Sequence, residues 1–355
     1  MSLHFWQQEH LAKVTKSPLK RSLVVFITIL SLLNATTGCS LGQTQEKQTI
    51  GERPVESSQR ESPLESPQQK APPSDDMLSG KLVYQGQVRT YHLHLPSGYN
   101  RNRSWPLVLA FHGGYGSGKR LARNTGFNAL ADQEGFIVVY PDGINRHWND
   151  GRGTANPNID DVGFVRALID RLVRYRNIDP SRIYATGISN GGQFTQRLAC
   201  EMSDKIAAFA PVAATFPAAI KSSCKPKNSV AMLMINSPQD PLVPWQGGEG
   251  GGLGGKILSV AETVEFWRKH NNCSPVGQTQ ALQNIAPSDG TQVRVSSYSG
   301  GCPRSEVILY TIEGGGHTWP DGRENAVISR VGKTSRQLRA SQVIWNFFKR
   351  HSLSS

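Results

Sequence analysis

A serine flanked by glycines stands where a predicted strand turns into a predicted helix. The stretch "YATGISNGGQF", 184–194, holds Ser189 between Gly187 and Gly191. A sharp strand-to-helix turn strains the dihedrals of its corner residue, and the glycines leave room for the chains to pass. The corner side chain then stands above the sheet at the positive end of the new helix. This pattern is typical of a nucleophile elbow, so Ser189 is predicted to be a catalytic nucleophile.

A serine hydroxyl needs a general base at neutral pH, and the base needs an orienting acid. On such an elbow the order along the chain is Ser, then Asp or Glu, then His. The histidines after Ser189 are His270, His317 and His351. His317 follows the apolar run "VILYTI" in the Gly-rich loop "EGGGHTWPDG", where the backbone is free to direct the imidazole across the sheet. We therefore expect His317 to be the base, and the alternative is a loop histidine without a catalytic role.

The orienting acid is predicted to be Asp240. This residue lies in "SPQDPLVPWQGG", directly after the predicted strand "VAMLMINS" at 230–237. Active sites of open α/β sheets assemble at the carboxyl ends of strands. The alternative acids lie on predicted helices or at the end of one: Glu201, Asp204, Glu262 and Glu265. The alternative for Asp240 is a turn residue before Pro241.

Backbone donors for an oxyanion are predicted in two places. A tetrahedral intermediate needs N–H groups directed at its negative oxygen. The segment "FHGGYGSG", 111–118, closes a predicted strand with a His-Gly-Gly loop. The N–H of Gly114, or of a close neighbour, and that of Asn190 would form the oxyanion hole. We expect His112 to be structural.

Three tryptophans flank these loops: Trp148, Trp245 and Trp319. They could line an ester pocket and stack on an aromatic acyl group or a sugar, or they could pack the loops, and both readings stay open. Asp160 and Asp161 are expected to cap the helix that follows rather than to take part in chemistry.

The elements that must position these residues alternate between strand and helix. The runs 106–113 and 135–143 are continuously apolar, as in strands buried on both faces, whereas 88–96 alternates with period two. Helices are predicted at 124–134, 161–178, 191–203, 261–270 and 335–351, with further strands at 181–189, 205–214 and 306–315. This alternation predicts a mainly parallel sheet with helices on both faces. Gly247 to Gly255 is expected to be a flexible loop and not a nucleotide site.

The first 76 residues have a different character. Of the formal charge of +12, four cations and one acid lie before residue 22, and the remaining Lys and Arg are scattered, which favours a basic soluble surface over nucleic-acid binding. The apolar run 23–33 is short for a membrane span and is typical of a secretory signal. It ends in "NATTGC", which resembles a bacterial lipoprotein signal with lipidation at Cys39. The alternative is a plain cleaved signal.

These observations predict three parts of the chain. Residues 1–39 are a signal peptide with a lipobox, and 40–76, rich in Gln, Ser, Pro and Glu, form a disordered tether. Residues 77–355 form the folded domain. Its four cysteines, Cys200, Cys224, Cys273 and Cys302, suggest two disulfides in an exported chain, with three pairings open. The chain lacks a CxxC motif or His-rich cluster, so neither a metal site nor a cofactor is predicted.

Eight ordered motifs together resemble a known family. They are "FHGGYGSG", "YPDG", "WNDGR", "DDVGF", "GISNGG", "DPLVPWQGG", "GGGHTWP" and "VIWNFF", spread over about residues 78 to 351. The combination is similar to the polyhydroxybutyrate depolymerase-like esterases, which overlap the feruloyl and acetylxylan esterases of carbohydrate esterase family one. One departure is "MINSPQD", where the family usually has a His-Gly pair ahead of the acid.

The resemblance implies an α/β-hydrolase fold with Ser189, Asp240 and His317 as the triad. It also implies the disulfides Cys200–Cys224 and Cys273–Cys302. The expected function is an exported serine esterase that acts on a polysaccharide-linked acyl ester or a hydroxyalkanoate oligomer through an acyl-enzyme. Membrane contact is expected through the lipid anchor alone, without nucleic-acid binding. The alternative is a lipid-anchored binding protein that keeps the fold without catalysis.

Overall fold

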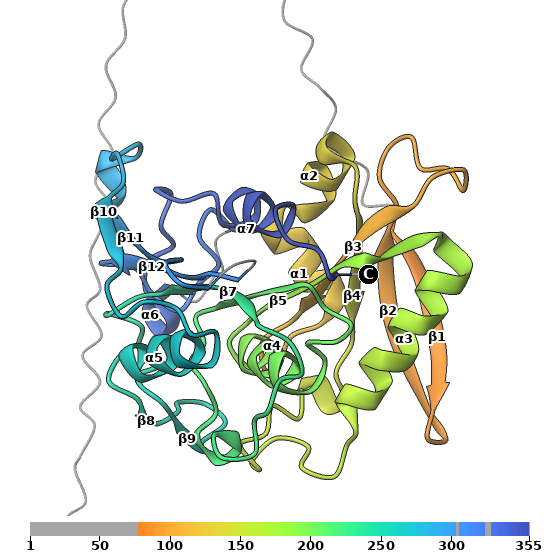
Figure 1. Cartoon of the computed structure of the whole chain (residues 1–355), viewed down its shortest axis with the longest axis horizontal. Coiled ribbons are helices and arrows are strands. Elements are labelled where there is room, and N and C mark those ends of the chain that lie inside the picture. The colour runs from red at the N-terminus through yellow and green to blue at the C-terminus, as the bar shows by residue number, and fades with distance from the viewer. Residues whose placement is uncertain (1–76, 303–304, 324–327, 355) are drawn as a thin grey trace, which may run out of the picture. The chain divides into compact units, whose positions relative to one another are not determined.

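The computed structural model describes residues 77–302, 305–323 and 328–354 (Figure 1). The predicted signal peptide, 1–39, and the predicted tether, 40–76, therefore lie outside the described residues, as does Cys39. Within the described ranges, no helix combines the length and the apolar character that a membrane crossing requires.

A ten-stranded sheet forms the centre of the described part. Its order is β1-β2-β4-β3-β5-β6-β7-β12-β11-β10. The six strands from β4 to β12 in this order pair in parallel, and the pairs at both edges are antiparallel. The strands are β1 (Leu78–Tyr84), β2 (Gln87–His94), β3 (Trp105–Phe111), β4 (Ile137–Pro141), β5 (Ile178–Ile188), β6 (Ala208–Val212), β7 (Ala231–Asn236), β10 (Gln278–Ala281), β11 (Gln292–Tyr298) and β12 (Val307–Glu313).

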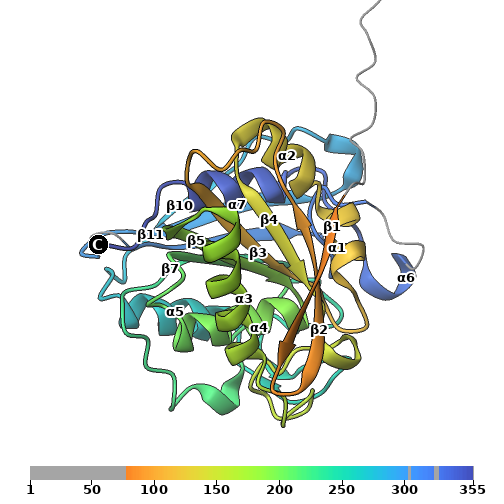
Figure 2. The same ribbon diagram turned by 90° about the vertical axis from the view of Figure 1, so that its right-hand side faces the viewer.

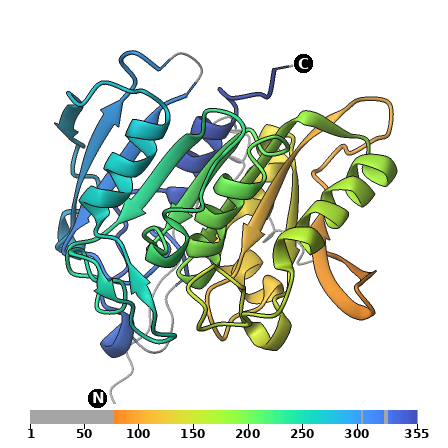
Figure 3. The ribbon, with the colours of Figure 1, turned by 60° about the horizontal axis from the view of Figure 1, so that its bottom comes forward.

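Helices cover both faces of this sheet, as Figures 1 and 2 show. One face carries α1 (Gly118–Thr125), α2 (Phe127–Glu134) and α7 (Ala340–Phe348), and the other carries α3 (Asp161–Arg176), α4 (Asn190–Glu201) and α5 (Val260–His270). In Figure 3 the helices of the second face lie in front of the sheet, with α4, in green, at the centre. The short helix α6 spans Ile328–Val331.

The two apolar layers follow from the alternation of side chains along a strand. On β3, Leu107, Leu109 and Phe111 belong to the core beneath α3, α4 and α5. Val108 and Ala110, between them, belong to the core beneath α1, α2 and α7. Because successive side chains of a strand point to opposite faces, a continuously apolar strand is buried on both sides. The predicted mainly parallel sheet with helices on both faces is confirmed.

Several elements differ from the predictions. The helix predicted at 124–134 is two helices, because Gly126 has a left-handed φ of 70° that ends α1 and precedes α2. The closing helix, predicted at 335–351, spans only Ala340–Phe348. Part of the Gly-rich loop 247–255 pairs with the residues after it, since β8 (Gly248–Glu249) lies antiparallel to β9 (Lys256–Ile257). The strands β1, β10 and β11 were not predicted.

The two acidic residues at the start of α3, Asp160 and Asp161, make different contacts. Asp160 is the N-cap of α3, and its carboxylate accepts a hydrogen bond from the Gly163 N–H at 2.8 Å, as predicted. Asp161 instead forms a buried ion pair with Arg89 at 2.6 Å and accepts the Asn149 N–H at 2.7 Å. The ion pair joins β2 to α3, and the Asn149 hydrogen bond ties the loop that follows β4 to the same carboxylate.

Candidate active site

Ser189 lies at a strained corner between β5 and α4. Its dihedrals are φ 58° and ψ −124°, which place a non-glycine residue at positive φ. A Cβ on Gly191 would collide with the carbonyl oxygens of Phe111 and His112, and one on Gly187 would lie 2.5 Å from the carbonyl oxygen of Gly191. The glycines are therefore required by the close passage of β3 beside the turn, for the reason that the sequence pattern suggested.

His317 and Asp240 form a buried hydrogen-bonded pair. The Nδ1 of His317 lies 2.8 Å from Oδ2 of Asp240, and the two side chains are 7% and 1% exposed. The other oxygen, Oδ1, accepts the backbone N–H groups of Leu242 at 2.8 Å and Val243 at 2.9 Å. An ionised carboxylate only accepts hydrogen bonds, so Nδ1 carries the proton and Nε2 keeps its lone pair.

The loops that carry this pair are tied to each other. The Ser237 hydroxyl donates to the carbonyl of Gly315 at 2.6 Å, and the Gln239 amide oxygen accepts the Gly314 N–H at 2.7 Å. Both links join the loop after β7 to the loop after β12, which are neighbours because those strands pair in parallel. The segment "MINSPQD", which departs from the family pattern, thus supplies its own contacts to the histidine loop.

Ser189 and His317 line one cavity of about 330 Å³. The rest of its wall comes from segments 112–117, 120–121 and 251–253, together with Asn124, Arg152, Ile188, Gln193, Leu242, Val243 and Val331. Among the hydrogen bonds of the described residues, none joins the Ser189 hydroxyl to His317. Such catalytic bonds are often long in substrate-free enzymes and tighten when substrate binds.

The predicted oxyanion donors lie beside Ser189. A Cβ on Gly113 would stand 3.3 Å from the Cβ of Ser189, so the loop after β3 touches the elbow. Two neighbouring N–H groups are already used, since Tyr115 donates to Arg146 and Gly116 to Gly113, each at 3.0 Å. The N–H groups of Tyr115 and Gly116 are therefore not free to bind an oxyanion, and Gly114 stays the predicted donor of that loop.

The second donor comes from α4. Asn190 is the first residue of this helix, where N–H groups have no acceptor inside the helix. The position of Asn190 is compatible with the predicted oxyanion hole, which stays a prediction for its backbone N–H and that of Gly114.

His112 is structural, as expected. Its Nε2 accepts the Gly143 N–H at 3.0 Å, and its Nδ1 lies 2.8 Å from the carbonyl of Gly113, so the neutral ring carries its proton on Nδ1. Burial lowers the pKa of His112 below its ordinary value and keeps the ring neutral. The ring ties the His-Gly-Gly loop to the turn after β4.

A buried polar network that the sequence reasoning missed supports the elbow. The Asn190 side chain holds the backbone of Trp148, with its oxygen 2.8 Å from the N–H and its amide nitrogen 3.0 Å from the carbonyl. The same amide group donates to Asp150 at 2.7 Å. Asp150 is fully buried and forms an ion pair with Arg152 at 2.7 Å. Arg152 in turn donates to the carbonyl of Gly254 at 2.8 Å, so one network joins the elbow to the Gly-rich loop.

That Gly-rich loop forms part of the cavity wall. A Cβ on Gly114 would lie 3.2 Å from Leu253, so the loop passes close to the predicted oxyanion donor. The apolar Leu253 between glycines was a signal for this contact that the sequence reasoning did not use. The cavity-facing residues of α1 were missed as well, because the predicted helix began too late.

Of the two roles left open for the tryptophans, the structure favours packing, since none of the three lines the cavity. Trp148 is fully buried, stacks on Phe194 and donates its indole N–H to the carbonyl of His112 at 3.0 Å. Trp319 is 1% exposed and donates to the Ser341 hydroxyl at 3.1 Å. Trp245 packs against the core beneath α5 and does not line the cavity. Packing, the alternative reading, accounts for these aromatic rings.

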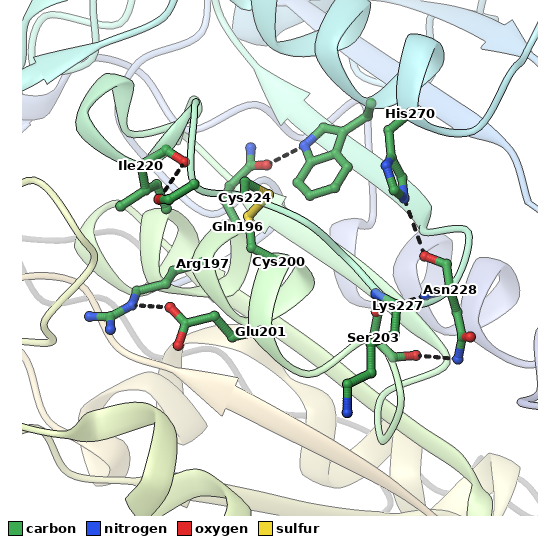
Figure 4. Close-up of a disulfide and its surroundings, with 12 residues drawn as sticks. Gln196, Arg197, Cys200, Glu201, Ser203, Ile220, Cys224, Lys227, Asn228 and His270 are labelled. Carbon is green, nitrogen blue, oxygen red and sulfur yellow. Dashed lines mark hydrogen bonds and ion pairs between the residues drawn. A yellow bond between two sulfur atoms is a disulfide. The ribbon is translucent and has the colours of Figure 1, made fainter.

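The structure contains the disulfides Cys200–Cys224 and Cys273–Cys302, the pairing that the resemblance implied. Figure 4 shows the first of them beside the Arg197–Glu201 ion pair of α4. It fastens the last turn of α4, away from Ser189, to the loop before β7. No cluster of metal-ligating side chains occurs among the residues that the structure describes.

Comparison with known proteins identifies the family of this chain. A family model, "Esterase PHB depolymerase", matches residues 89–224. The putative esterase NocK of Nocardia uniformis subsp. tsuyamanensis is 31% identical over 280 residues, which cover 75% of this chain and 81% of that protein. Feruloyl esterase B of Piromyces equi is 31% identical over 237 residues, 64% of this chain but only 42% of the relative.

A solved structure supports the fold. The crystal structure of a thermostable esterase superposes with a TM-score of 0.52 and 17% identity, over 79% of this chain and 64% of that one. The predicted α/β-hydrolase fold is confirmed. The chain therefore belongs to the polyhydroxybutyrate depolymerase-like esterases and is a carboxylic ester hydrolase.

Proposed function

We propose that the protein is a serine esterase in which Ser189, His317 and Asp240 act as a triad. The observation that carries the proposal is the buried hydrogen bond of 2.8 Å between His317 and Asp240, with His317 and Ser189 on the wall of the same cavity. Asp240 fixes the imidazole tautomer that leaves Nε2 free to accept a proton.

In the proposed reaction, the Ser189 oxygen attacks the ester carbonyl carbon while Nε2 of His317 removes the hydroxyl proton. The carbonyl oxygen becomes an oxyanion that the N–H groups of Gly114 and Asn190 stabilise. Collapse of this intermediate breaks the bond to the alcohol, which leaves with the proton from His317. Water, activated by the same imidazole, then hydrolyses the acyl-enzyme and frees the acid and Ser189.

The proposed substrate is an acyl ester linked to a polysaccharide or an oligomer of a hydroxyalkanoate. Relatives carry the names feruloyl esterase and acetylxylan esterase, and the matching family model is that of polyhydroxybutyrate depolymerase esterases. The cavity of about 330 Å³ is in the range of small-molecule sites, so it would take one acyl group with part of its alcohol.

We also propose that the protein is exported and carries a lipid on Cys39. The apolar run 23–33, the segment "NATTGC" and the polar stretch 40–76 support this. Two disulfides support an oxidising compartment.

The test of the proposed function is hydrolysis of 4-nitrophenyl acetate by the purified protein and two serine variants. Ser189→Ala should lower kcat by several orders of magnitude, comparable with other triad deletions. Among the described residues, the Ser223 hydroxyl bonds only to the nearby Ile220 carbonyl, so Ser223→Ala should keep the wild-type rate. Wild-type activity in the Ser189→Ala variant would overturn the assignment.

A further inference from the structure

One wall of the cavity is a single face of α1. Arg120, Leu121 and Asn124 line the cavity from this helix, and Ser117, its N-cap, lines it from one turn earlier. Residues spaced by three, four and seven lie on the same face of a helix, so this face is turned to the site that also holds Ser189. The sequence reasoning assigned no role to these residues.

Arg120 is the cation of the cavity wall that has no ion-pair partner among the described residues. Among the described residues that line the cavity, Arg120 and Arg152 are charged and none is an aspartate or glutamate. Arg152 is already neutralised by Asp150. The guanidinium of Arg120 forms no ion pair or hydrogen bond with any residue that the structure describes, whereas its backbone N–H bonds to Ser117. Arg120 is exposed, and its charge therefore lies at the rim of the cavity that Ser189 also lines, without a partner among the described residues.

The surroundings of α1 do not offset this charge. The helix, "GKRLARNT", has no acid and carries Lys119 and Arg123 besides Arg120. The described carboxylate bonded to its first turn is Asp142, which accepts the Gly118 N–H at 2.8 Å and the Thr90 hydroxyl at 2.7 Å. Asp142 also lies 3.1 Å from His92, and it forms no ion pair with Arg120.

We infer, on the basis of the proposed esterase function, that Arg120 binds a carboxylate on the substrate. Arginine presents a planar fork that matches the two oxygens of a carboxylate. Leu121 and Leu253 line the same cavity and offer apolar surface to the rest of such a substrate. The site therefore selects esters whose acyl or alcohol half ends in a carboxylate.

Both proposed substrate classes can carry this group. In a hydroxyalkanoate oligomer the free terminal carboxylate lies on the alcohol half, whichever ester bond is cut, because the acyl half ends in the terminal hydroxyl. A polysaccharide ester carries a carboxylate on the alcohol half where the sugar part contains uronic acid. Both sources therefore place the carboxylate on the alcohol half, and recognition of the acyl half would point to a substrate of neither class.

The experiment uses two matched pairs of esters. The first pair is 4-acetoxybenzoate and its methyl ester, which differ in a carboxylate on the alcohol half. The second is mono-4-nitrophenyl adipate and its methyl ester, which differ in a carboxylate on the acyl half. The quantity compared is the ratio of kcat/KM for the anionic ester to kcat/KM for its neutral partner. Intrinsic reactivity cancels when this ratio is compared between variants.

The variants are Arg120→Gln and, as matched control, Arg123→Gln. Arg123 is exposed on the same helix and does not line the cavity. Arg120→Gln should lower the ratio about tenfold in at least one pair and leave neutral esters within about twofold, because one partly exposed charged contact is lost. Arg123→Gln should keep the wild-type ratio. Unchanged ratios in both pairs for Arg120→Gln, or equal losses in both variants, would overturn the inference.

A binding measurement separates this inference from the esterase proposal. Calorimetric titration of 4-acetoxybenzoate and mono-4-nitrophenyl adipate into Ser189→Ala protein reports recognition without hydrolysis. Adding Arg120→Gln should weaken binding of the recognised ester about tenfold, and adding Arg123→Gln should not. If wild-type protein hydrolyses no ester, the esterase proposal fails, and equal affinities in this titration would overturn the role of Arg120.

Discussion

Asp240 holds His317 with one carboxylate oxygen and two backbone N–H groups with the other. The His317 contact spans 2.8 Å across 77 residues of sequence, and the N–H contacts to Leu242 and Val243 span 2.8 and 2.9 Å. The backbone groups can only donate, so they fix which oxygen faces the imidazole. This arrangement leads to a prediction about Asp240→Asn.

In Asp240→Asn, the amide oxygen should stay on the two N–H groups and the NH₂ should face His317. The imidazole would then accept at Nδ1 and carry its proton on Nε2, where it cannot take the proton of Ser189. We expect kcat to fall about 10⁴-fold with the fold retained, as for a triad with the wrong tautomer. Stopped-flow or steady-state hydrolysis of 4-nitrophenyl acetate, with circular dichroism for the fold, measures this.

The control for that prediction is Asp170→Asn on the surface of α3. Asp170 pairs with Lys205 at 2.8 Å and its side chain is 57% exposed, so its loss should leave kcat unchanged. A rate within tenfold of wild type in Asp240→Asn would speak against its role as orienting acid.

Arg152→Met should destabilise the protein and loosen the site. Asp150 would remain fully buried without its ion-pair partner, which costs about 3–5 kcal/mol in the free energy of unfolding. The hydrogen bond from Arg152 to the Gly254 carbonyl would be lost too. We therefore expect both kcat/KM and the free energy of unfolding to fall. Urea denaturation measures the first effect. Arg182→Met, which removes an exposed pair with Asp179, should cost at most about 1 kcal/mol, and equal losses in the two variants would contradict the prediction.

Removing the disulfide Cys200–Cys224 should lower stability more than activity. Its sequence separation of 24 corresponds to about 3.5 kcal/mol of chain entropy in the unfolded state. The double variant Cys200→Ala/Cys224→Ala should therefore melt about 7–14 °C lower by calorimetry. Because the bridge lies at the end of α4 away from Ser189, kcat at 25 °C should be retained. An unchanged Tm would contradict the expected restriction of the unfolded chain by this bridge.

The buried His112 predicts a loss of stability in mild acid. Burial lowers the pKa of His112 in the folded state below its unfolded value of about 6.5, so the unfolded chain binds the proton first. Stability from this group is full above about pH 6.5 and is lost as the pH falls toward the lower folded-state pKa. The free energy of unfolding of the wild type should therefore drop more between pH 7.5 and 5.5 than that of His112→Gln. If the free energy of unfolding falls equally with pH in both proteins, protonation of His112 is not the cause of the loss. All other histidines are common to the two proteins.

The sequence could predict the parts of the site that follow from strand geometry. Ser189, Asp240 and His317 each follow a run with a clear apolar strand pattern, and the carboxyl ends of parallel strands meet at one edge of the sheet. The glycines at the elbow also have a local cause, namely the close approach of β3. Such features depend on the backbone and need no knowledge of distant side chains.

The parts that failed depend on tertiary contacts. A tryptophan in a loop packs inward or lines a pocket according to what lies beside it, and Trp148 is covered by Phe194 and β3. The helix α1 is short and has only a narrow buried stripe, including Leu121 and Ala122, so few apolar positions mark it in the sequence. The edge strand β10 is exposed along its length and likewise lacks an apolar pattern.

The central claim is that one serine hydroxyl forms the acyl-enzyme, and labelling with a fluorophosphonate probe tests it most directly. Wild-type protein should be labelled stoichiometrically, with the adduct mapped by mass spectrometry to the peptide that contains Ser189. Labelling should vanish in Ser189→Ala and become far slower in His317→Ala. An adduct on another residue, or full labelling of Ser189→Ala, would contradict the account.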